Sequence, residues 1–238
     1  MDTDDQVHGQ GKRTLCIDHN PPIHIDFRVD HQDTMTSSPL WPHTIIILAG
    51  GESRRMGQTK HELQLPDGKT LMDAAVQCAT EVGRQVVIAG PEHVRPELKH
   101  VDDDGGGPLA GIVAALEHGF DDRYIFMPCD MPALTPELLL RLGRNLASHD
   151  AAIFQNSNGP KQALLPLALQ ARTLEQAKSA MAGTQRSIYA FLANIDSIHL
   201  GITDDEQSQL LNINTPDQWK CFLGTTGNRT EPLDDATN

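Results

Sequence analysis

The chain has 238 residues, of which 39% are hydrophobic, and it carries a formal net charge of -13. The length fits one α/β domain with polar tails, and no stretch approaches the roughly 18 consecutive apolar residues that a membrane span requires. The acidic balance argues against general nucleic-acid binding, which needs a basic face.

Residues 1–42 differ in composition from the rest of the chain. They contain many aspartates, histidines and prolines with little hydrophobic period, which predicts a disordered N-terminal extension. The first five residues are acidic and precede no apolar run, and the four cysteines form no CxxC pair. Both features predict a cytoplasmic protein without disulfides or structural zinc. Four potential metal ligands in this segment match no ligand spacing and are interpreted as solvated: His19, His24, Asp26 and His31.

From Thr44 onward, short β-branched runs alternate with segments of helical period. The expected elements of the first half are strand Thr44–Leu48, helix Leu71–Val82 ending at Gly83, strand Val86–Ala89, helix Pro108–His118 ending at Gly119, strand Tyr124–Met127, and helix Thr135–Ala147 with Thr135 as N-cap. This alternation predicts a Rossmann-like α/β fold, with a mostly parallel sheet and helices on both faces.

The second half continues the pattern with weaker periods. The expected elements are strands Ala151–Phe154, Gln162–Leu169 and Ser197–Leu200, helices near 171–181 and 186–193, an apolar run Leu210–Ile213, and a last short helix from Pro216. Residues 224–238 are polar and have no apolar period. We therefore expect one domain over 43–223 and a polar C-terminal tail over 224–238.

A glycine-rich loop follows the first expected strand, over Leu48–Lys60 (LAGGESRRMGQTK). In open parallel sheets ligands bind at the carboxyl ends of strands. Gly50 and Gly51 let the backbone approach a ligand closely, and their N–H groups can face phosphate oxygens. Three cations of the loop can neutralise a triphosphate: Arg54, Arg55 and Lys60.

Two better-known glycine motifs do not fit this loop. A P-loop requires GxxxxGK[ST], but here Gly57 is followed by Gln58. The GxGxxG spacing of a dinucleotide fingerprint is also absent. The alternative of a plain surface loop with solvated arginines is disfavoured, because a double glycine at a strand end is followed by three cations.

The second motif, Met127–Pro132 (MPCDMP), also follows an expected strand. Asp130 then lies at the same edge of the sheet as the glycine loop. Magnesium takes one or two carboxylates together with phosphate oxygens and water, and the flanking prolines stiffen the turn. Asp130 stands five residues before the expected helix, too far to cap it. The motif therefore predicts a Mg²⁺ ligand.

Two further segments offer polar groups. In Asp102–Gly111 (DDDGGGPLAG) acidic residues and glycines precede a helix, where an aspartate can accept hydrogen bonds from a base or ribose; a flexible acidic turn is the alternative. In Leu211–Pro216 (LNINTP), Asn212 and Asn214 alternate on one face of an extended segment, which suits a polar substrate or metal-bound water. Taken alone, an asparagine turn before a helix is common.

In combination, the motifs LAGGESRRMGQTK, VDDDGGGPLAGI, MPCDMPAL and LNINTPDQ make the chain resemble molybdenum cofactor guanylyltransferases, the MobA-like nucleotidyltransferases. That family has the pattern LAGGxSxRMG…K, D…GPLAGI, PCDxP and NxNTP in this order. The resemblance covers about residues 44–223, and residues 183–188 (GTQRSI) resemble a further family stretch.

The resemblance implies transfer of GMP from GTP to the terminal phosphate of Mo-molybdopterin, with Mg²⁺ as cofactor and pyrophosphate as the second product. Protein partners would be molybdenum-insertion proteins and chaperones of molybdoenzymes. The implied roles are nucleotide binding by the backbone of Leu48, Ala49, Gly50 and Gly51, phosphate binding by Lys60 and Arg55, nucleotide contact by Asp103 or Asp102, metal and nucleotide binding by Asp130, and contact with the reacting phosphate and metal by Asn212 and Asn214.

The chain departs from the family pattern at three positions. Thr59 stands where an acidic residue is usual, His61 where a small residue is usual, and Ala89 where some members have asparagine. These departures bear on nucleotide recognition more than on the reaction class.

Three other functions stay open. A sister family that transfers CMP favours LAAG and a different tripeptide around the aspartate, and sugar-1-phosphate nucleotidyltransferases have longer chains and a longer loop. The third is a non-catalytic carrier of nucleotide or cofactor.

Overall fold

The computed structural model describes residues 14–15, 23–24, 41–50, 60–103, 105–155 and 165–226, with backbone only for 14–15, 23–24 and 225–226. The strands of its main sheet are β3 (Trp41–Leu48), β4 (Gly83–Ala89), β5 (Lys99–Val101), β6 (Arg123–Pro128), β7 (Ala151–Gln155), β8 (Leu167–Gln170) and β9 (Ser197–Gly201). Two short strands, β1 (Thr14–Leu15) and β2 (Ile23–His24), form a separate antiparallel pair.

The helices alternate with the strands along the chain. They are α1 (Leu71–Val82), α2 (Pro108–His118), α3 (Pro136–Leu146), α4 (Leu174–Ala182), α5 (Ile188–Leu192), α6 (Asp204–Gln209) and α7 (Pro216–Thr226), with 3₁₀ turns η1 (Lys60–Glu62), η2 (Glu92–Val94) and η3 (Ala171–Thr173). In the described part of the chain, no helix is long and apolar enough to cross a membrane.

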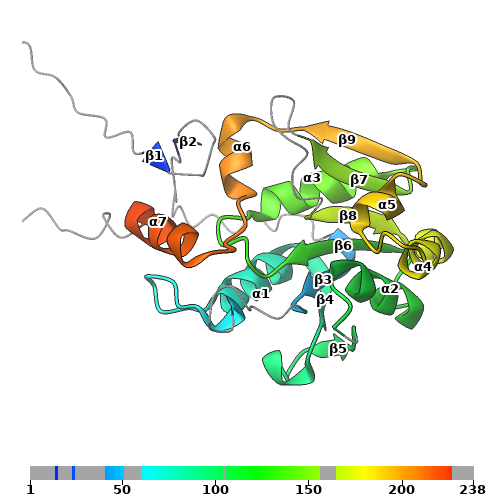
Figure 1. Cartoon of the computed structure of the whole chain (residues 1–238), viewed down its shortest axis with the longest axis horizontal. Helices are drawn as coiled ribbons and strands as arrows, with labels where there is room; N and C mark the ends of the chain where they lie inside the picture. Colours follow the sequence, from blue (N-terminus) through cyan, green and yellow to red (C-terminus); the bar gives the residue numbers. More distant parts are fainter. Residues whose placement is uncertain are drawn as a thin grey trace, which may run out of the picture.

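The main sheet has the strand order β5-β4-β3-β6-β8-β7-β9 (Figure 1). Strands β5, β4, β3 and β6 pair in parallel, and β7 pairs in parallel with β9. Strand β8 is antiparallel to both of its neighbours. The predicted α/β class and mostly parallel sheet are confirmed, with one reversed strand at the centre.

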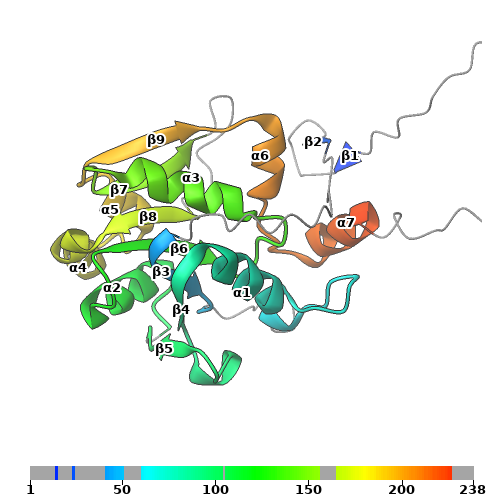
Figure 2. The same ribbon diagram turned by 180° about the vertical axis from the view of Figure 1, so that it is seen from behind.

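Each face of the sheet has its own apolar core, because side chains alternate along the strands. Ile45 and Ile47 of β3 pack with α1 and α3, whereas Ile46 and Leu48 pack with α2, α4 and α5. Figure 2 shows the same layers from behind. Strand β3 is buried on both faces, which explains its uninterrupted Thr44–Leu48 run of apolar and β-branched residues.

Two helices begin and end where the sequence predicts. Thr70 caps α1 in a capping box with Asp73: the Asp73 N–H donates to the Thr70 hydroxyl and the Thr70 N–H donates to the Asp73 carboxylate. Gly119 ends α2 in the left-handed region, with φ of 70°. Thr135 stands at the N-cap of α3, but its hydroxyl donates to Gln209 and not to the helix.

Other elements differ from the prediction. Gly83 ends α1 in an extended conformation and already begins β4. The strand expected over 162–169 is observed over 167–170, with residues 162–164 outside the described residues, and the helix expected near 171–181 opens with η3. The helix near 186–193 is shorter, and α7 continues to Thr226, past the expected end of the domain at 223.

Strand β5 and helix α6 were not predicted. Strand β5 (KHV) is short and half polar, and α6 (DDEQSQ) has no apolar stripe, so neither shows the hydrophobic periodicity that predicts a strand or a helix. Tertiary pairing with β4 forms the first, and a capping box between Thr203 and Glu206 begins the second.

Candidate active site

The carboxyl ends of four parallel strands meet at one edge of the sheet. The register aligns Leu48 of β3 with Ala89 of β4 and with Pro128 of β6, and Ala89 with Val101 of β5. The segments that follow these strands carry Gly50, Asp103 and Asp130, so three of the motifs singled out in the sequence come together here. We call this the carboxyl edge.

Lys60 joins the second and fourth motifs at the carboxyl edge. Its ammonium nitrogen lies 3.1 Å from Asp130 Oδ2 and 2.7 Å from Asn214 Oδ1. The Lys60 and Asp130 side chains are only 20% and 15% exposed, so solvent screens this ion pair less than a surface pair. Residues that stand 154 positions apart in sequence thus share one small polar cluster.

Local structure holds the backbone of Lys60 in place. The residue begins η1, and the Leu63 N–H donates to the Lys60 carbonyl at 3.1 Å. Leu63 is 5% exposed and belongs to a small apolar cluster with Leu71 of α1, against which Trp219 of α7 packs. This cluster ties the η1 segment to the helix that follows the asparagine motif.

The asparagine segment is fixed to the Asp130 turn by the main chain. The Ile213 N–H donates to the Asp130 carbonyl at 2.9 Å, and the Ile213 side chain is buried. At the start of α7, the Asn214 and Thr215 N–H groups donate to Gln218 Oε1, and the Gln218 N–H donates to the Thr215 hydroxyl. This arrangement has the form of a capping box, and it orients Asn214 toward Lys60.

Two buried oxygens at the carboxyl edge have no hydrogen-bond partner among the described residues: Asp130 Oδ1 and Asn212 Oδ1. Buried polar atoms are nearly always satisfied, so two such atoms close to an ion pair point to a ligand, water or ion. Carboxylate and neutral amide oxygens are the donors that a hard divalent cation prefers. The residues present therefore fit a Mg²⁺ ion.

Asp103 lies directly against Gly50. A Cβ atom added to Gly50 would stand 1.9 Å from Asp103 Oδ2, so only glycine permits this approach. The Asp103 side chain is buried, its Oδ1 accepts from the Gly105 N–H at 3.0 Å, and Asp102 beside it is exposed. Of the two aspartates left open by the sequence, Asp103 is the one against Gly50.

A groove of about 540 Å³ opens beside Asp103, between α2 and α4. Its lining combines small apolar side chains with charged ones: Asp102, Asp103, Gly106, Ala110, Val113, Ala114, Glu117, Lys178, Met181, Ala182 and Arg186. Arg186 belongs to the GTQRSI stretch, so this fifth motif reaches the same region. The groove is also lined by Lys178 of α4, which belongs to no motif and was not predicted from the sequence.

Three predicted site residues, Gly51, Arg54 and Arg55, lie outside the described residues, as does Thr59. Ala89, where some family members have asparagine, is fully buried at the end of β4. Sequence reasoning missed Ile213 and Gln218, which bind backbone groups; the T-x-x-Q spacing from Thr215 to Gln218 was the available signal.

Cys129, next to Asp130, does not serve as a nucleophile. Burial of the thiol, reinforced by the neighbouring Asp130 carboxylate, raises the pKa of Cys129 to about 12. The thiol is therefore protonated at neutral pH, and a thiolate is the reactive form.

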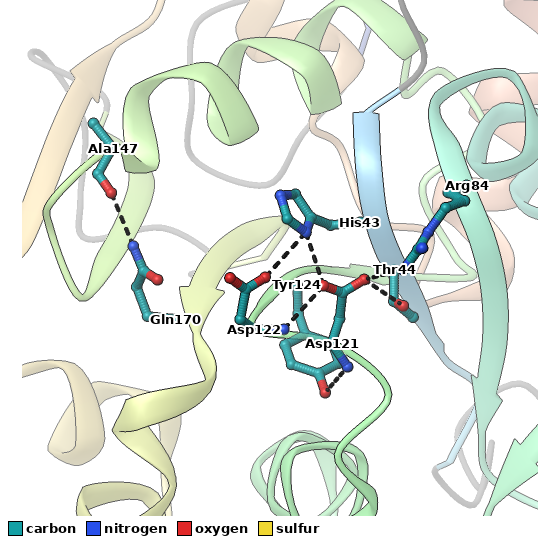
Figure 3. A network of polar contacts seen from close by, with 8 residues as sticks. All are labelled: His43, Thr44, Arg84, Asp121, Asp122, Tyr124, Ala147 and Gln170. Carbon is teal, nitrogen blue, oxygen red and sulfur yellow. Dashed lines mark hydrogen bonds and ion pairs between the residues drawn. The ribbon is translucent and has the colours of Figure 1, made fainter.

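The amino ends of β3 and β6 carry a second charged cluster, which we call the amino edge (Figure 3). His43 Nδ1 lies 2.8 Å from Asp121 Oδ1 and 3.2 Å from Asp122 Oδ1. Asp121 Oδ2 also accepts from the Arg84 guanidinium at 3.0 Å and from the Thr44 hydroxyl at 3.3 Å. Among the described residues, one group of His, Cys, Asp or Glu side chains lies close enough together to hold a metal: His43, Asp121 and Asp122.

The amino edge is better explained as a structural ion pair than as a metal site. Both Asp121 oxygens already accept hydrogen bonds, and Arg84 supplies the positive charge. Burial raises the pKa of Asp121, but hydrogen bonds from His43 and from the Asp122 N–H outweigh burial and lower it to about 2. A metal here would have to displace partners that the carboxylate already has.

The comparisons with known proteins identify the family. The model of the MobA-like NTP transferase domain matches residues 45–198, more than half of the chain. The chain belongs to the MobA-like NTP transferase family. It is 32% identical over 190 residues to a molybdenum cofactor guanylyltransferase of Xanthomonas euvesicatoria pv. vesicatoria (strain 85-10), covering 76% of this chain and 95% of that protein.

Other relatives agree. A molybdenum cofactor guanylyltransferase of Shewanella piezotolerans is 27% identical, with 73% of this chain and 88% of that protein covered. The crystal structure of molybdopterin-guanine dinucleotide biosynthesis protein A from Archaeoglobus fulgidus has a TM-score of 0.66 at 25% identity and covers 77% of this chain and 98% of that one. A CMP:2-keto-3-deoxy-manno-octonic acid synthetase, with a TM-score of 0.62 at 15% identity, shares the fold over 78% of this chain and 98% of that one. The chain is a nucleotidyltransferase of this family.

Proposed function

We propose that this nucleotidyltransferase transfers GMP from GTP to the terminal phosphate of Mo-molybdopterin, forming molybdopterin guanine dinucleotide and pyrophosphate. The observation that carries the proposal is the cluster of Lys60, Asp130 and Asn214 at the carboxyl edge, beside two buried oxygens without partners in the described chain. Relatives named for this reaction support the choice of substrates.

Asp130 would hold the catalytic Mg²⁺, with Asn212 and Asn214 beside it. Bound there, the ion supplies Lewis-acid polarisation of a phosphate oxygen and draws the two substrates together. Asp130 is held in place by the flanking prolines and by the hydrogen bond that the Ile213 N–H donates to the Asp130 carbonyl. These residues therefore hold the oxygens on a fixed backbone, so little backbone reorganisation is needed during the reaction.

Lys60 would bind the phosphates of the nucleotide, together with Arg55 of the glycine loop. Its ammonium is a mobile point charge on a flexible stem, already placed beside Asp130. The backbone of Leu48, Ala49, Gly50 and Gly51 would pass close to the nucleotide. The Ala49 N–H donates to the Ala89 carbonyl, which anchors the start of this loop to β4.

Asp103 would read the base. A carboxylate accepts two parallel N–H donors, and guanine offers two such donors side by side at N1 and its exocyclic amino group. Cytosine does not present that pair. The buried position of Asp103 against Gly50 favours a specific, desolvated contact at this point.

No general base is required for the reaction. The attacking group is a phosphate monoester oxygen that is largely ionised at neutral pH, and the protein contributes positioning and charge neutralisation. The substrates GTP and molybdopterin are cytoplasmic in this proposal, and molybdenum-insertion proteins or molybdoenzyme chaperones would be its protein partners.

The test is pyrophosphate release with Mg²⁺ and molybdopterin-loaded acceptor, comparing GTP, CTP and ATP. Preferential turnover of GTP supports the proposal. Preference for CTP would overturn the choice of base, and binding of GTP without any turnover would overturn catalysis in favour of a carrier. The Asp122→Asn variant, changed at the exposed amino edge, is the matched control for Asp130→Asn because both aspartates flank β6.

A further inference from the structure

Lys60 stands where a metal cofactor would also need to bind. Its ammonium takes Asp130 Oδ2 and Asn214 Oδ1, two of the oxygens that a divalent cation would use. Asn214 Oδ1 is the closer contact, at 2.7 Å. A lysine ammonium and a divalent cation within a few ångströms repel strongly in a partly buried site.

The charges of the side chains around Asp130 also disfavour binding of a divalent cation beside Lys60. Asp130 contributes one negative charge, Asn212 and Asn214 contribute neutral oxygens, and Lys60 contributes one positive charge. Within these four side chains the Lys60 ammonium offsets the Asp130 carboxylate, which weakens the attraction that Asp130 offers a bare divalent cation. A triphosphate changes this balance, because its oxygens can take both the ammonium and the metal.

We propose that Lys60 acts as a placeholder that keeps the divalent metal out of the Asp130–Asn214 position until a nucleoside triphosphate draws the ammonium away. This inference rests on the proposed function for the identity of the metal and the nucleotide. Lys60 is a positioning residue here: metal and nucleotide enter as a pair, and Lys60 exchanges carboxylate and amide partners for phosphate oxygens.

The local structure allows this exchange without moving the backbone. The main chain of Lys60 is held in η1 by the bond to Leu63 and by the Leu63–Leu71 contact. Only side-chain rotations are needed, and the Lys60 side chain is 20% exposed, so it is not sealed in the core. The Asn214 backbone stays fixed by Gln218 whichever cation is bound.

The experiment measures Mn²⁺ binding to the full chain by the electron paramagnetic resonance signal of free Mn²⁺, without nucleotide. The Lys60→Met variant keeps the apolar stem and removes the charge. It should bind Mn²⁺ about tenfold more tightly than the natural protein, while binding Mn²⁺–GTP more weakly. Opposite changes for bare metal and for metal–nucleotide are a signature that a merely structural role would not produce.

Three variants serve as controls. Lys69→Met removes a charge at a site paired with Asp67 and Gln77, and should leave Mn²⁺ binding unchanged. Lys60→Arg keeps the charge and should not tighten it. Asp130→Asn combined with Lys60→Met should abolish the gain, which assigns the metal to Asp130. Lys60→Gln, checked by thermal unfolding, replaces Lys60→Met if that variant does not fold.

The outcomes separate this inference from the proposed function. Tighter Mn²⁺ binding by Lys60→Met supports the placeholder role even if no GMP transfer is found. Unchanged or weaker Mn²⁺ binding by folded Lys60→Met and Lys60→Gln overturns it, even if GMP transfer is observed in the natural protein.

Discussion

The two ends of β3 and β6 each carry an aspartate cluster, and the two clusters differ in how well they are satisfied. At the amino edge, both Asp121 oxygens accept hydrogen bonds, from His43, Thr44, Arg84 and the Asp122 N–H. At the carboxyl edge, Asp130 Oδ1 has no partner within the described chain, and Oδ2 accepts a hydrogen bond from Lys60.

The difference separates a structural group from a ligand-binding group. A carboxylate with all its acceptors filled stabilises the fold and has nothing left to offer a substrate. A buried carboxylate with an open lone pair costs stability, and such a cost is typical of binding sites. Each cluster pairs an aspartate with a basic side chain and is partly buried, so charge and burial alone do not tell them apart.

The largest expected effect is on turnover. Asp130→Asn removes the charge that would hold the metal and should lower kcat about a thousandfold, the scale of a main electrostatic contributor. Asp122→Asn, at the other end of β6, should change kcat by less than about twofold. Steady-state assays with Mg²⁺ and GTP check both, and comparable losses in the two variants would erase the contrast between the edges.

The next largest effect concerns the close contact between Gly50 and Asp103 at the carboxyl edge. In Gly50→Ala the new methyl would collide with Asp103 Oδ2, so Asp103 must turn away. We expect a loss of about 1–3 kcal/mol in stability, as for other overpacked sites, and weaker GTP binding. Urea unfolding and GTP titration measure the two effects.

A double variant shows whether this collision is the cause. Gly50→Ala combined with Asp103→Ala should recover stability but not GTP binding. Gly201→Ala is the control, because a Cβ at that exposed position meets nothing within 4 Å. No recovery in the double variant would place the cost of Gly50→Ala elsewhere.

At the amino edge the expected effect is on stability and depends on pH. The folded-state pKa of Asp121 is about 2, below the roughly 3.9 of an unfolded chain. A depressed carboxyl pKa stabilises the fold above the unfolded pKa, and the contribution fades as the pH falls from about 4 to about 2. Asp121→Asn should therefore cost about 2 kcal/mol at pH 6, roughly half of that at pH 3, and close to nothing below about pH 2.

Urea unfolding of the natural chain and of Asp121→Asn at several pH values provides the measurement. The groups facing Asp121 are His43, Arg84 and Asp122. A difference in unfolding free energy that is independent of pH would show that Asp121 stabilises by packing alone.

The smallest effect concerns the exposed member of the amino edge. The Asp122 side chain is 77% exposed, so its contact with His43 is screened by water. Asp122→Asn should change the free energy of unfolding by less than about 0.5 kcal/mol. A larger loss would mean that His43 depends on both aspartates.

Local pattern was sufficient for many elements. Helices Leu71–Val82 and Pro108–His118 were predicted to the residue, because an apolar stripe marks the first, an N-terminal proline begins the second, and a glycine follows each. Strands β3, β4, β6 and β7 of the main sheet were also located, since they are short apolar runs between turns. The Lys99–Val101 strand and the Asp204–Gln209 helix lack such signals and depend on their neighbours.

The sequence by itself determined the fold class and the family. It also predicted that motifs at strand ends reach one edge of a parallel sheet, and the roles of the individual site residues stay predictions. Only the tertiary structure decided that Lys60 contacts both Asp130 and Asn214, that Asp103 and not Asp102 lies over Gly50, and that the His43–Asp121 pair is fully satisfied. The physical reason is distance along the chain: each contact joins segments that only the packed sheet brings together.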